Sequence, residues 1–338
     1  GDRFTAREVA VQTPLLDLRF STAGATLGSV QLPQYHTPSG QEVELMSAGR
    51  RGLALRLQNR EETIDLSTVE FTPNREEVVV DSGDVATLRM TADLGGGRSV
   101  QNTYQFAGDN YAVQLDVKVV GFGADAELFL QWEGGVAETE GKTVESSLFF
   151  ASPTVRRMMT YLNEERIDHE ADEEQATSTE DKGPVKWAAV RNQYFMVALA
   201  PSGEGPFRVG LHAAPSRSAA LKDDVWFEIG TRVVPGDGAK SLLYLGPLSY
   251  DTLLEYGMEL EAALDLGFPV IREISKVLLV LFVATYEFVP NYGVVIILLA
   301  VAIKILVYPL THKSYESMAK MQQVQPKMAA LREKYKND

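Results

Sequence analysis

One lysine, Lys304, lies within an otherwise uncharged run of 17 residues from Val294 to Leu310. An ammonium group inside a membrane would attract carboxylates strongly, because its field is weakly screened at low dielectric. Ionisable residues in spanning helices usually mark functional sites. Lys304 is six positions before Leu310, so its stem could also reach the headgroups, about 9 Å away along the helix axis. The residues alone leave both a functional lysine and a snorkelling lysine open.

Three methionines, Met318, Met321 and Met328, recur at helical spacing after the apolar run. One interpretation is ordinary packing against a second helix that lies outside this sequence. The other is a flexible apolar surface that contacts varied hydrophobic segments, a use to which the unbranched methionine side chain is suited. Either interpretation predicts an amphipathic helix whose apolar face lacks its partner here.

Other residues that bind metals or act in catalysis are present but lack a recognised spacing. The sequence has no cysteine, which excludes disulfides and thiolate-bound zinc. The triplet Gly95 to Gly97 lacks the lysine of a phosphate-binding loop and predicts a turn. We therefore expect no catalytic site, metal or cofactor, and we predict that the protein is not an enzyme. The residues set aside are Asp168, His169, Glu170, Asp172 and Glu173 as metal ligands, and the scattered histidines His36, His169, His212 and His312.

The element that positions Lys304 is a predicted transmembrane helix over residues 291–311. Twelve of the 17 residues in the apolar run are Val, Ile or Leu, and each favours insertion by roughly 0.3–0.6 kcal/mol. Together they outweigh the roughly 2.5–3.5 kcal/mol that a central lysine costs. The run is just long enough to cross a hydrocarbon core about 30 Å thick. The helix can therefore enter a bilayer together with its charge.

Charge differs sharply on the two sides of this helix. Residues 304–338 carry seven Lys/Arg and three Asp/Glu, which gives a net charge of +4. Residues 1–303 carry 25 Lys/Arg and 43 Asp/Glu, which gives a net charge of −18. Basic flanks stay in the cytoplasm, so residues 1–290 are predicted to be periplasmic and residues 312–338 cytoplasmic. Such an acidic domain argues against nucleic acid as a partner. The asymmetry disfavours the alternative of a helical hairpin that dips into the membrane and returns.

Alternating apolar and polar residues predict strands over most of residues 1–250. The alternation is clear at Leu16–Phe20, Leu53–Leu57 and Tyr111–Val119, with turn-forming residues between such runs. Many short antiparallel strands indicate a mainly β fold and an unusually large β-sandwich. Residues 163–182 contain nine Asp/Glu and are predicted to form a solvated loop within the sandwich.

Helical spacing replaces the strand pattern after Pro247. Apolar residues from Leu253 to Leu264 recur every three or four positions and predict a helical linker over residues 251–267. Residues 268–290 begin charged and then become apolar, but this apolar run is short and interrupted. It is typical of an amphipathic helix lying in the membrane interface.

The tail after the spanning helix is also predicted to be helical. Pro309 predicts an end or a bend there, with Thr311 or Ser314 capping the next helix. Residues 312–338 then form an amphipathic cytoplasmic helix, which Pro326 is expected to kink.

Several of these runs resemble one known family, the YidC membrane-protein insertases (YidC/Oxa/Alb). Its first conserved transmembrane helix and cytoplasmic hairpin resemble NYGVVIILLAVAIKILVYPLT at 291–311 followed by SYESMAKMQQVQPKMAALREKY. The periplasmic domain of its Gram-negative members resembles VQTPLLDLRFSTAGATLGSVQLP near the N-terminus, VKWAAVRNQYF at 185–195 and LYLGPLSYDTLLEYG at 243–257. The resemblance covers nearly the whole chain.

This resemblance implies a periplasmic β-supersandwich, a helical linker, an interfacial helix, a groove helix and the start of a cytoplasmic hairpin. The implied function is an inner-membrane insertase and folding chaperone that acts alone or beside the Sec translocon. In that family five transmembrane helices surround a water-filled groove, whose basic residue attracts acidic tails of incoming proteins. Lys304 matches this residue by position, where the family more often has arginine. Met318, Met321 and Met328 become candidate contacts of nascent chains.

The resemblance also implies partners and a larger protein. The partners are nascent membrane proteins, components of the Sec translocon and the lipid bilayer, with the ribosome as a candidate partner of the full-length protein. The sequence starts at Gly1 without a methionine or an export signal, which predicts a preceding targeting or anchor helix. Four further conserved helices do not occur in it, so this fragment by itself is expected to be inactive.

A second function of another class remains open from the residues. Large supersandwiches resemble the sugar-binding modules of galactosidases and mutarotases, where rings stack on sugars beside carboxylates. A membrane-tethered periplasmic carbohydrate-binding or mutarotase-like domain is therefore the alternative function, and a wet cleft with two rings and a carboxylate would support it. Another view, compatible with the insertase, makes residues 1–268 a docking surface for the Sec machinery. The aromatic residues considered are Trp132, Trp187, Tyr194, Phe195 and Trp226.

Overall fold

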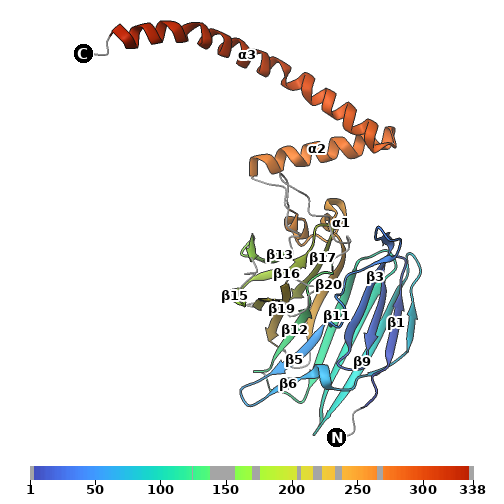
Figure 1. The fold of residues 1–338 in the computed structure, drawn as a ribbon. Helices are drawn as coiled ribbons and strands as arrows, with labels where there is room; N and C mark the ends of the chain where they lie inside the picture. The colour runs from blue at the N-terminus through green and yellow to red at the C-terminus, as the bar shows by residue number, and fades with distance from the viewer. Residues whose placement is uncertain are drawn as a thin grey trace. The chain divides into compact units, whose positions relative to one another are not determined.

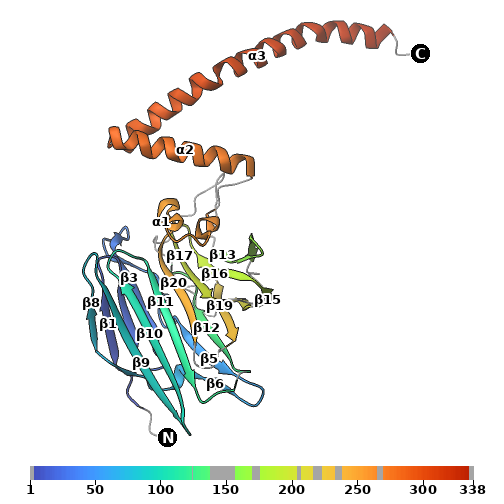
Figure 2. The same cartoon turned by 180° about the vertical axis from the view of Figure 1, so that it is seen from behind.

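The chain divides into two units, Gly1–Leu264 and Asp265–Asp338, and each is described by itself. Figures 1 and 2 show strands and short helices in the first unit and two long helices in the second. The structure is a computed structural model, and it describes residues 4–123, 125–137, 157–169, 176–203, 207–215, 223–232, 238–264 and 269–334.

The described strands of the first unit form three sheets. The nine-stranded sheet has the order β14 (Glu165–His169), β13 (Arg157–Leu162), β16 (Val185–Arg191), β17 (Phe195–Ser202), β20 (Ala239–Pro247), β11 (Ala112–Val120), β10 (Arg98–Ala107), β9 (Val85–Gly95) and β7 (Thr72–Pro73). The six-stranded sheet has the order β15 (Thr177–Gly183), β18 (Phe207–Pro215), β19 (Asp223–Arg232), β12 (Glu127–Glu133), β5 (Ala54–Gln58) and β6 (Thr63–Asp65). The five-stranded sheet has the order β4 (Glu42–Glu44), β3 (Thr26–His36), β2 (Asp17–Ser21), β1 (Glu8–Gln12) and β8 (Glu77–Val79).

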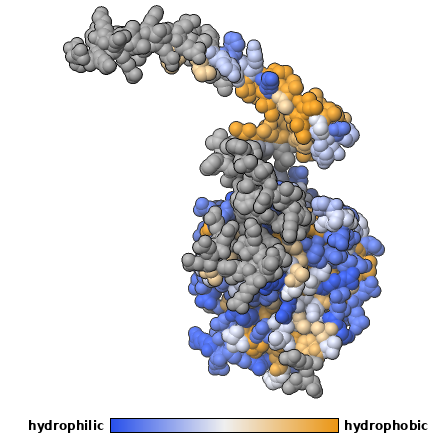
Figure 3. Space-filling model, viewed as in Figure 1, coloured by the Kyte–Doolittle hydropathy of each residue, from blue (hydrophilic) through white to orange (hydrophobic). Residues whose placement is uncertain are grey.

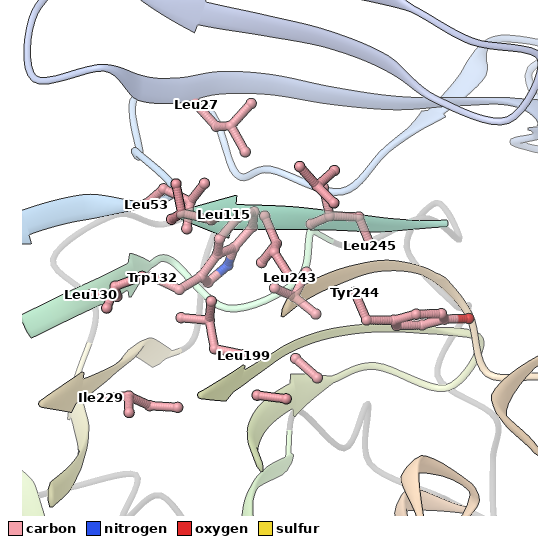
Figure 4. Packing of buried hydrophobic residues seen from close by; sticks show 14 of the residues in the cluster. Leu27, Leu53, Leu115, Leu130, Trp132, Leu199, Ile229, Leu243, Tyr244 and Leu245 are labelled. Atoms are coloured by element: carbon pink, nitrogen blue, oxygen red, sulfur yellow. The ribbon is translucent and has the colours of Figure 1, made fainter. Parts of the chain in front are cut away.

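The five-stranded and six-stranded sheets are joined by a short bridge. Leu27 and Gly52 exchange two backbone hydrogen bonds of 2.8 and 2.9 Å. The nine-stranded sheet packs against them, and Figure 4 shows Trp132 of β12 among Leu115, Leu199 and Leu243 of that sheet. Trp132 is fully buried. The predicted mainly β fold and large β-sandwich are therefore confirmed.

The alternation in the sequence matches the burial of the strands. Along β9, β10 and β11 most alternate side chains are buried, so one face packs on the core and the other meets water. The turn between β9 and β10 contains Gly95, Gly96 and Gly97, all at positive φ. Glycine adopts this conformation without steric cost, so the predicted turn is confirmed.

The predicted acidic loop over residues 163–182 is wrong for much of its length. Residues Glu165–His169 form β14 and Thr177–Gly183 form β15. Both are edge strands, where exposed charged side chains are tolerated and discourage pairing with other chains. High local charge therefore did not prevent strand formation. Residues 170–175 lie outside the described part of the chain.

The predicted linker helix is broken into two short pieces, α1 (Tyr250–Leu254) and the 3₁₀ helix η2 (Leu260–Ala263). Gly257 and Glu259 between them have φ values of +62° and +53°. This left-handed conformation ends a right-handed helix. The helical spacing in the sequence was real, but it does not correspond to one continuous helix. Another 3₁₀ helix, η1 (Leu66–Thr68), connects strands in the sandwich.

The second unit contains α2 (Pro269–Phe288) and α3 (Tyr292–Lys334). Asn291 caps α3, since its Oδ1 accepts hydrogen bonds from the backbone nitrogens of Gly293 at 3.0 Å and Val294 at 3.3 Å. The rings of Tyr286 and Tyr292 stack with centroids 4.3 Å apart. These contacts fix the corner between the two helices.

Helix α3 continues through Pro309 and Pro326. The prediction that a new helix begins at Thr311 or Ser314 is therefore wrong. Proline removes one backbone hydrogen bond, and nearby hydroxyl groups often compensate in membrane helices. Here Thr311 Oγ1 donates to the carbonyl oxygen of Val307 at 3.0 Å, one turn back along the helix, and not to that of Ile305, which loses its backbone partner at Pro309. Figure 1 shows α3 as one unbroken, gently curved helix.

Candidate functional site

Lys304 lies on the part of α3 that could cross a membrane. By length and composition, the stretch Tyr292–Pro309 is the one helical segment of the described chain that could span a bilayer. Only 6% of this segment is buried, and Lys304 is exposed on its surface. The structure therefore places the candidate lysine on the exposed surface of a helix that is long and apolar enough to span a membrane.

Apolar side chains dominate the rest of this surface. Ile296, Ile305 and Leu306 are all more than half exposed, although water does not solvate such side chains favourably. Figure 3 shows this as an orange band over α2 and the first part of α3. A continuous exposed surface of this kind is typical of contact with lipid or with other membrane helices.

Several polar side chains share the face of Lys304. Tyr308, Thr311 and Tyr315 follow it by four, seven and eleven residues, and such spacings place side chains on one side of a helix. The ring of Tyr308 lies 6.0 Å from that of His312. Sequence reasoning singled out Lys304 and missed these neighbours, although their helical spacing was visible.

The candidate contact methionines all belong to α3. Met318 and Met321 are 56% and 66% exposed. Met328 lies further along the same helix, and its side chain is outside the described part of the structure. Their role as contacts for nascent chains stays a prediction.

In the first unit, side chains of the sandwich bind the linker through hydrogen bonds. Arg166 Nη1 donates to the carbonyl oxygens of Ala262 at 2.9 Å and Leu264 at 3.1 Å, which closes the C-terminal end of η2. Its Nη2 pairs with Asp168 at 2.9 Å. A guanidinium suits this role, because its several donors have fixed directions.

Two neighbours on β16 hold the linker before η2. Trp187 Nε1 donates to the carbonyl oxygen of Met258 at 3.1 Å, and Lys186 Nζ lies 2.6 Å from Glu259 Oε2. The hydrogen bond to Glu259 raises the pKa of Lys186. The linker is therefore bound to the sandwich up to Leu264, although it contains little regular helix.

The acidic segment contains a polar cluster rather than a recognisable metal centre. His169 Nε2 lies 3.2 Å from Asp181 Oδ2, which also accepts a hydrogen bond of 2.9 Å from Thr160 Oγ1. This cluster links β14 and β15, the edges of two different sheets. Within the described residues, no group of three His, Asp or Glu side chains could hold a metal ion. Glu170, Asp172 and Glu173 lie outside those residues.

Three described cavities bear on the carbohydrate-binding alternative. A cavity of about 630 Å³ is lined by the rings of Tyr35, Tyr194 and Phe195 but by no carboxylate. Another of about 710 Å³ contains Glu164 and Glu259 with the single ring of Phe207. A third, of about 460 Å³, has Asp116 and no ring. None of these three cavities combines two rings with a carboxylate, and Trp132 and Trp187 are fully buried.

The two units define a class of protein. A large β-sandwich precedes a helix that is long and apolar enough to span a bilayer, as in membrane proteins with a large domain outside the hydrocarbon core. The YidC periplasmic domain family matches residues 8–281, and the 60Kd inner membrane protein family matches residues 284–338. The chain belongs to the YidC membrane-protein insertase family.

Individual relatives agree with this membership. Proteins from Chlorobaculum parvum and Geobacter metallireducens, each named membrane protein insertase YidC, are 32% and 31% identical to this chain. The matches cover 99% and 98% of this chain but 58% and 61% of the relatives. The chain therefore spans about three fifths of the length of these curated relatives.

Two solved structures show a distant likeness to this chain. The α-N-acetylgalactosaminidase NagBb from Bifidobacterium bifidum is 10% identical, with a TM-score of 0.46, over 76% of this chain and 39% of that one. A galactose mutarotase-like protein from Lactobacillus casei is 8% identical, with a TM-score of 0.42, over 71% of this chain and all of that one. Likeness at this level carries no argument about function.

Proposed function

We propose that this chain is part of a membrane-protein insertase and folding chaperone of the inner membrane. The observation that carries the proposal is Lys304, a single charge inside the spanning segment of a chain that belongs to this family. A charged side chain within the hydrocarbon core of a membrane is costly unless it faces water or an oppositely charged partner. The further helices of a longer protein would supply a hydrated groove around it.

In this proposal Lys304 attracts a carboxylate on the tail of an incoming protein. Two opposite unit charges 4 Å apart attract by about 4 kcal/mol at an effective dielectric of 20, against about 1 kcal/mol in water. The lysine thus draws an acidic tail into the membrane region, and the apolar segment that follows the tail enters the lipid. The groove acts through charge and shape, and no covalent step is required.

The acidic sandwich faces the periplasm in this proposal, and the basic end of α3 faces the cytoplasm. The charge difference between residues 1–303 and 304–338 supports this orientation. Nascent membrane proteins and the bilayer are the proposed partners of the groove. Components of the Sec translocon and the ribosome are proposed partners of the full-length protein, with the sandwich as a docking surface for Sec.

The proposal is tested by charge at position 304 in the full-length protein. Insertion of a client with a short acidic tail should fall several-fold in Lys304→Ala, because the attraction to the tail is lost. Lys304→Arg keeps the charge and should insert the client nearly as well as the unchanged protein. Insertion is measured by protease protection of the client's tail in vesicles. Equal insertion by all three proteins would refute the proposed role of Lys304.

A further inference from the structure

The face of α3 that carries Lys304 is apolar before this residue and carries polar side chains after it. Tyr308, Thr311 and Tyr315 continue this face toward the C-terminal end. Ile297 and Ala300 precede Lys304 on it and have no polar side-chain atom. We call Lys304 together with Tyr308, Thr311 and Tyr315 the polar stripe.

The polar stripe reaches from Lys304 toward the basic end of the helix only. Its four members span the 12 residues from Lys304 to Tyr315, or about 16 Å at a rise of 1.5 Å per residue. Tyr308 and Tyr315 are 65% and 66% exposed, so their phenols project away from the helix. A ligand that enters from the basic end would meet these hydroxyls before Lys304.

The hydroxyl groups of the polar stripe differ in what they can donate. Thr311 Oγ1 already donates its proton to the carbonyl oxygen of Val307, so this proton is not free for an acidic ligand. The phenol of Tyr308 extends too far from the helix axis for such a backbone bond. Side chains four residues apart have Cβ atoms about 5–6 Å apart. One carboxylate can therefore contact both the ammonium of Lys304 and the hydroxyl of Tyr308.

A tyrosine near the end of a spanning helix has another common role, as an anchor in the membrane interface. As an anchor, the tyrosine would affect the position of its own helix, and this effect would not depend on the charge of the ligand. A donor for a carboxylate acts only when the carboxylate is present. The position of Tyr308 on the face of Lys304, one turn from it, favours the second role, because it places the hydroxyl within reach of a carboxylate that pairs with the lysine.

We propose that Tyr308 is a second ligand-binding residue beside Lys304, whose hydroxyl donates a hydrogen bond to the client carboxylate that pairs with the lysine. This inference rests on the proposed function. The ligand is a short acidic tail of an incoming membrane protein. Tyr315, closer to the basic end of the polar stripe, is the first hydroxyl that such a tail meets.

The test uses the full-length protein in vesicles and two client proteins that differ only in the tail. One tail carries Asp residues, and the other carries Asn at the same positions. Tyr308→Phe keeps the ring and removes the hydroxyl. It should slow insertion of the Asp client about fivefold, which corresponds to about 1 kcal/mol for one hydrogen bond. Insertion of the Asn client should not change.

Thr311→Val provides a matched control, since it removes a hydroxyl from the same face and should leave both clients unaffected. In a Lys304→Ala background, Tyr308→Phe should add no further loss for the Asp client. If Lys304→Ala inserts both clients normally, the proposed function itself is wrong. If Lys304→Ala slows the Asp client but Tyr308→Phe has no effect, or slows both clients equally, only the role of Tyr308 is wrong.

Discussion

Arg166 holds the end of the linker through two backbone carbonyls, those of Ala262 and Leu264. These carbonyls belong to the end of a short 3₁₀ helix, where backbone acceptors lack partners within the helix. Hydrogen bonds that involve a charged group are stronger than neutral ones. A single side chain therefore stabilises a segment that its own local sequence stabilises poorly.

Replacing Arg166 with alanine should release the end of the linker. Two backbone acceptors would lose their donor, and the cost of such losses is about 1–3 kcal/mol. We expect faster hydrogen exchange at the amides of residues 260–264 and little change in the strands of the core. Mass spectrometry of exchanged peptides measures this.

A second arginine provides the control for this variant. Arg7 forms an ion pair with Glu76 in which both side chains are more than half exposed, and such pairs contribute about 0–1 kcal/mol. Arg7→Ala should leave exchange in residues 260–264 unchanged. Unchanged exchange in the Arg166 variant as well would show that Arg166 does not hold the linker.

Four tyrosines, three in the sandwich and one in the linker, predict that the stability of the fold decreases at alkaline pH. Burial raises the pKa of Tyr256 to about 12 and also raises the pKa of Tyr104, Tyr111 and Tyr244. Because the folded protein disfavours the ionised phenol, the contribution of these tyrosines to stability should be constant below pH 10.0, the unperturbed pKa, and should fall at higher pH. The raised pKa of Lys186 acts in the same direction.

Thermal unfolding in detergent between pH 8 and 12 measures this dependence. The midpoint should be nearly constant up to about pH 10 and then decrease. Tyr256→Phe removes one of the ionising groups and should make the decrease shallower. A midpoint that stays constant to pH 12 would contradict the burial of these phenols in the folded state.

Among the elements, the bridge between the five-stranded and six-stranded sheets depends on a glycine. A Cβ atom at Gly52 would lie 2.3 Å from the ring of Trp132, and this ring is fully buried in the core. The backbone of Gly52 also makes both hydrogen bonds to Leu27. Gly52 therefore allows the chain to pass close to Trp132, and it also joins the five-stranded sheet to the six-stranded sheet.

Gly52→Ala should lower the free energy of unfolding by about 1–3 kcal/mol, the usual cost of overpacking a core. Gly28→Ala in β3 is the matched control, because the nearest atom to its Cβ would be a backbone oxygen 3.8 Å away. Thermal unfolding of both variants compares them. Equal midpoints for the two variants would show that Trp132 moves aside at little cost.

The sequence predicts the elements that follow from a local pattern of residues. It does not predict the elements that depend on contacts between residues distant in the sequence. Strands β9 to β11 follow from alternation, and the placement of Lys304 on an apolar helix follows from composition. Strands β14 and β15 were missed because their pairing with β13 and β18 outweighs their high charge. The linker is held by Arg166, whose acceptors are 96 and 98 residues away. No local pattern indicates such a contact.

The molecule as a whole combines an acidic sandwich with a helix that becomes basic after its spanning segment. Its charge changes from −18 over residues 1–303 to +4 over residues 304–338, and Lys304 is the first basic residue of the second part. In the proposed orientation, which rests on this gradient, the lysine lies where a tail arriving from the basic side could reach it. Orientation and function are thus linked in this account.

The central claim is that Lys304 faces water rather than acyl chains, and the accessibility of position 304 tests it most directly. The 338 residues contain no cysteine, so Lys304→Cys provides a selective label in a full-length protein without other cysteines. Leu306→Cys is the control, because two residues along a helix place a side chain nearly opposite.

The measurement is the rate of labelling by a membrane-impermeant maleimide applied to the cytoplasmic side of inverted vesicles. A hydrated groove open to that side predicts fast labelling at position 304 and slow labelling at position 306. Equally slow labelling at both positions would place the side chain of residue 304 in lipid and would contradict the proposed mechanism.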